Sequence, residues 1–176
     1  MDFSRLEHNI TDMMKEQQLK LGYRRESIRL YYPLSSLNRF LHTEYDRVQM
    51  HQALEDFSRE AEPRLGKLTV SSQKDRFCIL IPPEGAAYVH AHVEEDGFLS
   101  DLIQTVSKHG GTIEEVLSVF TSYSDHVQIE PLQDAEFDYL VYFTDGIPDA
   151  YRYCITNEGC HVTYHRFTKE DYEELF

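Results

Sequence analysis

The chain of 176 residues has no apolar segment long enough to cross a membrane as a helix. Its longest uninterrupted apolar run, Phe77 to Ile81, falls far short of the roughly 20 residues that a spanning helix requires. The N-terminus, Met1 to His8, lacks the apolar core of a secretory signal. We therefore expect a cytoplasmic protein that does not associate with membranes.

Cysteine is scarce, and an odd, sparse count is not that of a disulfide scaffold. The three cysteines are Cys78, Cys154 and Cys160. The last two flank an expected three-residue hairpin loop, 157–159. If Thr156 faces Cys160, the two thiols are diagonal neighbours with Cα atoms roughly 7–8 Å apart, too far for an unstrained disulfide. We expect buried, free thiols.

Basic residues are scarce in the second half of the chain. Residues 1–80 carry 13 Lys/Arg and 12 Asp/Glu, whereas residues 81–176 carry 4 and 19, and the whole chain has a net charge of −14. An acidic surface repels DNA, RNA and anionic lipid, which bind through Lys and Arg, so no nucleic-acid partner is expected. The acidity fits a basic protein partner, cation binding or solubility alone.

Sequence signatures of common enzyme classes are absent as well. The chain has no phosphate-binding loop, dinucleotide fingerprint, nucleophile elbow or His-Glu-x-x-His pair, so no cofactor is predicted. This favours a protein that works by binding, although it does not exclude an enzyme.

Hydrophobic spacing predicts an alternation of helical and strand-rich regions. Helical spacing is found over residues 3–21, 34–41, 45–62 and 98–108, and a further helix is expected at 23–30. Capping patterns, Thr112-x-x-Glu115 and Thr168-x-x-Asp171, open two more helices. Strands are expected at 68–70, 77–81, 87–94, 127–129, 137–144, 150–156 and 160–166.

This order of elements predicts an α+β fold. N-terminal helices pack with a mostly antiparallel sheet, arranged as two β-meanders separated by a helix pair. A single domain spans residues 1–176, and it divides at most into a helical subregion, 1–65, and a sheet-containing subregion, 66–176. The oligomeric state does not follow from the sequence.

The segment 23–32 is the best candidate for ligand recognition. In a helix Arg25 and Arg29 share a face, and Arg24 is adjacent. Guanidinium groups bind carboxylates or phosphates, and the rings of Tyr23 and Tyr32 can stack on a planar ligand. A small anion or nucleotide is one expected ligand. The alternative is that the arginines pair with the acidic residues of the chain itself.

The histidines suggest a metal site as a second hypothesis. Residues two or four apart on a strand share a face, so His90 and His92 point together, as do His161 and His165. With Glu94, these side chains could hold a divalent metal in a metal-binding protein or a metal-dependent hydrolase. The alternative is that they lie on the solvent face of an antiparallel sheet.

The segment from Leu21 to Leu37, LGYRRESIRLYYPLSSL, resembles the N-terminal signature of a small family of uncharacterised proteins from gut Firmicutes. This resemblance would extend over most of the chain. It implies a bacterial cytoplasmic setting, but no activity, substrate or catalytic residue.

Overall fold

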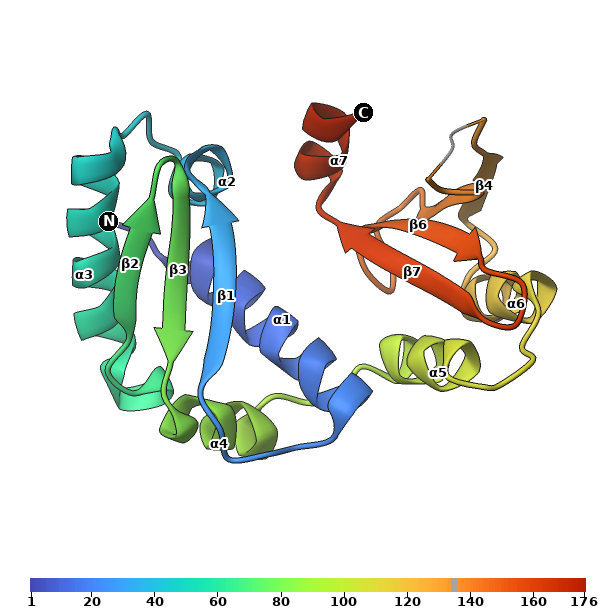
Figure 1. Cartoon of the computed structure of the whole chain (residues 1–176), viewed down its shortest axis with the longest axis horizontal. Coiled ribbons are helices and arrows are strands. Elements are labelled where there is room, and N and C mark those ends of the chain that lie inside the picture. The colour runs from blue at the N-terminus through green and yellow to red at the C-terminus, as the bar shows by residue number, and fades with distance from the viewer. Residues whose placement is uncertain (134–135) are drawn as a thin grey trace. The chain divides into compact units, whose positions relative to one another are not determined.

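The computed structural model describes residues 1–133 and 136–176, and the chain divides into two compact units, Met1–Glu95 and Asp96–Phe176. Residues 66–95 thus belong with the N-terminal helices, so this division does not coincide with the expected subregion boundary at residue 65. Helices and two antiparallel sheets (Figure 1) confirm the α+β fold. Within the described residues, no helix has the length and apolar character needed to cross a membrane.

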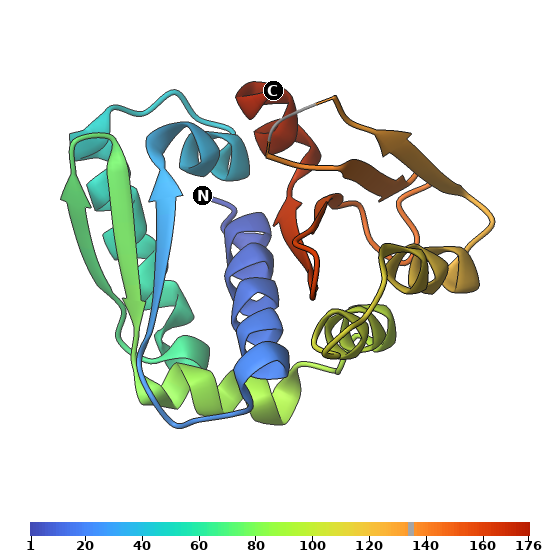
Figure 2. The same cartoon turned by 45° about the vertical axis from the view of Figure 1, so that its right-hand side comes forward.

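The first unit consists of a three-stranded antiparallel sheet, in the order β1-β3-β2, and four helices. Helices α1 and α3 lie along one face of the sheet (Figures 1 and 2). Because β1 pairs with β3 and not with β2, the next strand along the chain, this sheet is not the expected meander. The elements are α1 (Ser4–Leu21), β1 (Ile28–Pro33), α2 (Leu34–Leu41), α3 (Arg47–Leu65), β2 (Thr69–Gln73), β3 (Arg76–Ile81) and α4 (Pro83–His92).

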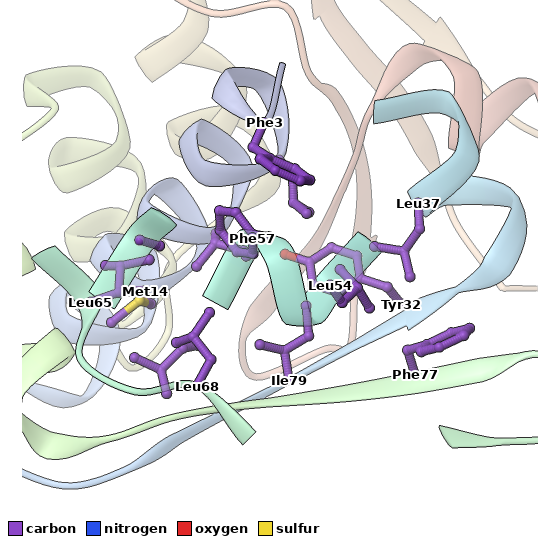
Figure 3. Packing of buried hydrophobic residues seen from close by; sticks show 14 of the residues in the cluster. Phe3, Met14, Tyr32, Leu37, Leu54, Phe57, Leu65, Leu68, Phe77 and Ile79 are labelled. Atoms are coloured by element: carbon purple, nitrogen blue, oxygen red, sulfur yellow. The ribbon is translucent and has the colours of Figure 1, made fainter. Parts of the chain in front are cut away.

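Strict alternation along β3 decides which face of this sheet is covered. Phe77, Ile79 and Ile81 are buried, whereas the residues between them are half-buried. The buried side chains meet apolar residues of the helices, among them Leu54 and Phe57 of α3, in one continuous core (Figure 3). The helices thus cover one face and leave the other open.

Two expected elements of the first unit are wrong. Residues 23–27 form a loop and residues 28–33 a strand, in place of a helix over 23–30. Residues 83–92 form helix α4, in place of a strand over 87–94. In α4 the buried residues are Gly85, Ala86 and Val89, and this spacing puts them on one helical face.

The second unit is a four-stranded antiparallel meander, β4-β5-β6-β7, with helices α5 and α6 before it and α7 after it. Thr112 and Glu115 form the expected capping box of α6, and Thr168 caps α7. The elements are α5 (Gly97–Val106), α6 (Ile113–Tyr123), β4 (Val127–Pro131), β5 (Tyr139–Phe143), β6 (Arg152–Asn157), β7 (Val162–Phe167) and α7 (Lys169–Leu175).

Aromatic rings form the centre of the second unit. Phe98 of α5 lies edge-on to Phe120, Phe143 and Tyr153, with ring centroids 5.0–5.8 Å apart. Such edge-to-face pairs are each worth about 0.5–1.5 kcal/mol beyond the burial of their surface. They join both helices to the middle of the meander.

The pairing of β6 with β7 corrects the expected register. Thr156 pairs with Thr163, and Cys154 pairs with His165, so the loop comprises residues 158–161. The cysteines are free as expected, and Cys154 is buried. Cys160 is exposed on the longer loop, so the expectation of buried thiols is wrong for this residue.

Gly85 allows the close approach of α4 to α3, and its substitution should destabilise the first unit. A Cβ atom at this position would lie 2.5 Å from the carbonyl oxygen of Leu65 and would also meet the side chain of Ile81. We expect Gly85→Ala to lower the free energy of unfolding by about 1–3 kcal/mol, measured by urea denaturation. Gly97→Ala adds the same methyl group where the nearest atom is 3.6 Å away and serves as the control. Equal stability of Gly85→Ala and the unchanged protein would contradict this packing argument.

Candidate functional site

The uncovered face of the first sheet carries the side chains that alternate away from the core. On β1 these are Arg29 and Tyr31, and both are exposed, Tyr31 to 57%. The register places Tyr31 opposite Cys78 and Pro33 opposite Arg76. Arg29, Tyr31 and Arg76 therefore share one open surface.

An open hollow of about 980 Å³ lies over this face. Arg29, Tyr31 and Arg76 line it, together with Lys74 from the turn between β2 and β3. Among the described residues, Asp75 is the only carboxylate that lines it. Three cations against one anion give the hollow a positive character, within a unit whose total charge is slightly negative.

The cations of this surface are available to a ligand. In the described parts of the chain, the side chains of Arg29 and Lys74 make no hydrogen bond or ion pair. The guanidinium of Arg76 lies 6.0 Å from the ring centroid of Tyr31, at the outer limit of a cation–π contact. Two unpaired cations and an exposed ring thus face solvent together.

The structure disperses the arginine and tyrosine residues expected to act as one site. Tyr23 stacks on His90, with ring centroids 4.0 Å apart. Arg24 lines a separate hollow of about 110 Å³ beside the end of α1. Arg25 is exposed in the loop. Because the segment is not helical, Arg25 does not share a helical face with Arg29, the one candidate that lies over the sheet.

Tyr32 is a core residue. It is 7% exposed, and its hydroxyl donates a 2.8 Å hydrogen bond to Oδ1 of Asn9, which is also buried. Its neighbour Tyr31 points to the opposite face of the strand, where it lines the open hollow.

The geometry does not support the histidine metal site. His90 and His92 lie on helix α4, and each stacks on a tyrosine. His161 and His165 belong to the second unit. Glu94 follows α4 and is exposed. Among the residues that the structure describes, no three His, Cys, Asp or Glu side chains are grouped so that they could hold a metal ion.

The arginines of the second unit lie on tyrosine rings. The guanidinium of Arg152 is 3.8 Å from the ring centroid of Tyr142, and that of Arg166 is 4.2 Å from the ring centroid of Tyr151. Residues 96–176 contain four Lys/Arg and sixteen Asp/Glu. The two contacts therefore involve half of the basic residues of this unit.

A buried polar pair also belongs to the second unit. Tyr153 is fully buried and donates a hydrogen bond from its hydroxyl to Asp149. Burial raises the pKa of Asp149 and, most of all, that of Tyr153. The pair joins the loop before β6 to the aromatic core, which is a structural role.

The sequence placed Tyr31 inside the candidate segment 23–32 without singling it out, and it did not indicate Lys74 or Arg76. The sequence pattern could have indicated Tyr31. Residues 28–32 alternate with a period of two, which places Arg29 and Tyr31 together on the face opposite the apolar residues. Lys74 and Arg76 come to lie near Arg29 because β1 pairs with β3. A local sequence pattern does not show which strands pair.

A family model described as a domain of unknown function, from an E. rectale gene description, matches residues 3–176. This confirms the resemblance found at residues 21–37, including its gut bacterial association. No curated protein and no solved structure matches the chain.

The two adjacent tyrosines should respond differently to the loss of the hydroxyl group. Tyr32→Phe leaves the buried Oδ1 of Asn9 without its donor, which we expect to cost about 1–3 kcal/mol of unfolding free energy. Tyr31→Phe, on the exposed face, should leave stability unchanged. Urea denaturation of both variants measures the difference, and equal effects would contradict the assignment of the two faces.

Proposed function

Since this chain belongs to the DUF3877 family, a domain of unknown function, we propose its function from its own surfaces: it binds an anionic ligand on the open face of the first sheet. The observation that supports this proposal is the cluster of Arg29, Lys74 and Arg76 around one hollow. No motif for catalysis accompanies the cluster, so binding is the function it favours.

The chemistry of the lining favours a ligand with both an anionic group and a planar ring. Guanidinium groups bind phosphate or carboxylate through paired hydrogen bonds. Tyr31 offers a ring face for stacking, which is worth about 1–3 kcal/mol for a nucleobase. Arg29 and Tyr31 lie two residues apart on one face of β1. A phosphate bound at Arg29 and a ring stacked on Tyr31 would thus occupy neighbouring positions along the strand. A nucleoside monophosphate carries a phosphate and a ring that can reach both positions at once.

Isothermal titration of the full chain with AMP tests this proposal, with inorganic phosphate and adenosine as partial ligands. AMP should bind more tightly than either part, because it alone engages both the cations and the ring. Arg29→Ala should weaken AMP binding by about 10- to 100-fold, the expected loss for a charge-assisted hydrogen bond. Tyr31→Ala should weaken the binding of AMP and leave that of inorganic phosphate unchanged.

Arg25→Ala is the matched control for this titration. It removes the same charge from the same unit, at an exposed loop position outside the hollow, and should change the affinity less than twofold. The proposal fails if AMP and inorganic phosphate do not bind, or if Arg25→Ala weakens binding as much as Arg29→Ala does.

The second unit favours a separate function, the binding of a basic protein partner. Its sixteen Asp/Glu outnumber four Lys/Arg, and both arginines lie against tyrosine rings. The unit therefore carries an excess of twelve acidic over basic residues. Such a surface attracts a cationic partner through forces that salt screens.

Binding of an oligolysine peptide at several salt concentrations tests this second function. The double variant Glu114→Gln/Glu170→Gln, at exposed positions of the second unit, should weaken binding several-fold at low salt. The control Glu26→Gln/Glu44→Gln makes the same change of charge at exposed positions of the first unit. If both double variants weaken binding equally, only the net charge matters, and the assignment to the second unit is wrong.

A further inference from the structure

The loop between β6 and β7 brings together a thiol, an imidazole and a carboxylate. Sγ of Cys160 lies 3.3 Å from Nδ1 of His161. Nε2 of the same ring lies 2.8 Å from Oε2 of Glu158. A nucleophile within reach of a base, which a third group orients, is the general arrangement of activated nucleophiles. All three residues are exposed, so a small molecule can reach the sulfur.

Backbone contacts hold this loop in place. The amide of Glu158 donates to the carbonyl of His161 at 2.9 Å, and Gly159 takes the positive φ of +87° that closes the turn. The amide of Gly110, in the connection between α5 and α6, donates to the carbonyl of Cys160 at 3.1 Å. The loop is therefore fixed both internally and against a second segment of the same unit.

The side-chain geometry indicates which atoms of His161 and Cys160 carry protons when the thiol attacks a disulfide. With its proton on Nε2, the neutral imidazole of His161 donates to Glu158 and presents the lone pair of Nδ1 to the thiol. Only the thiolate attacks a disulfide, and Nδ1 is placed to accept the thiol proton. The carboxylate of Glu158 stabilises the imidazolium that forms.

We propose that Cys160 is a reactive thiol that forms mixed disulfides with small-molecule disulfides, assisted by His161 and Glu158. The thiolate of Cys160 attacks one sulfur of the small disulfide, so that a new S–S bond forms and the original S–S bond breaks. The leaving thiolate takes the proton from Nδ1 of His161 and departs as a thiol. Cys160 is oxidised, and the departing half of the reagent is reduced.

The other cysteines show that this is a modification site and not a dithiol active centre. Cys154, the second cysteine of this unit, is buried, and Cys78 belongs to the first unit. Cys160 thus has no exposed cysteine in its own unit that could displace the attached group. The mixed disulfide should persist until an external thiol removes it.

Reaction of the native full chain with the aromatic disulfide DTNB tests this proposal, since the aromatic thiol that each exchange releases ionises in water to a coloured thiolate. Cys160→Ser should abolish the fast phase, whereas Cys78→Ser and Cys154→Ser should retain it. His161→Gln should slow the fast phase about tenfold at pH 7, because free thiols ionise only near pH 8.5.

His126→Gln is the matched control, because it removes another exposed imidazole of the same unit and should leave the rate unchanged. Glu158→Gln should give a rate between those of His161→Gln and the unchanged protein. Circular dichroism of each variant checks that it is folded. If folded His161→Gln reacts as fast as the unchanged protein at pH 7, or if Cys160 reacts only after unfolding, the proposal is overturned.

Discussion

The one-sided covering of the three-stranded sheet is the constraint on which the rest of the first unit depends. Phe77, Ile79 and Ile81 of β3 need an apolar partner, and helices α1 to α4 supply it on one face only. An antiparallel sheet tolerates water on its second face. Polar and cationic side chains there remain free to bind, because they have no role in the core.

Elements with clear local signals were predicted correctly, α1 and α2 from their apolar spacing alone. Helix α6 has both apolar spacing and the Thr112–Glu115 capping box, and α7 has its Thr168 cap. Helix α4 was misread because Ala87, Val89, Ala91 and Val93 alternate like a strand. The buried face of the helix consists of Gly85, Ala86 and Val89 instead, and the first two of these are small residues that give almost no hydrophobic signal. The close packing that Gly85 permits only becomes visible in three dimensions.

The candidate surfaces also depend on contacts between segments distant in sequence, which local sequence patterns do not show. Arg29 was indicated by its arginine- and tyrosine-rich segment, but its partners Lys74 and Arg76 come from a hairpin remote in sequence. At the β6–β7 loop, an expected loop of three residues placed Cys160 at the start of a strand. The true register lengthens the loop and brings Cys160 beside His161. A shift of three residues in the pairing, with Thr163 opposite Thr156 in place of Cys160, thus separates a thiol on a strand from an exposed thiol beside a base.

The local distribution of charge, more than the net charge of the chain, determines which ligands each surface attracts. At physiological ionic strength, charges on exposed groups are largely screened beyond about 8 Å. A ligand at the first sheet therefore responds mainly to the side chains of the hollow, three cations and Asp75, and not to the total of −14. In the second unit, sixteen Asp/Glu outnumber four Lys/Arg, so carboxylates dominate the local field. An acidic chain can for this reason present an anion-binding surface and a cation-attracting surface on separate units.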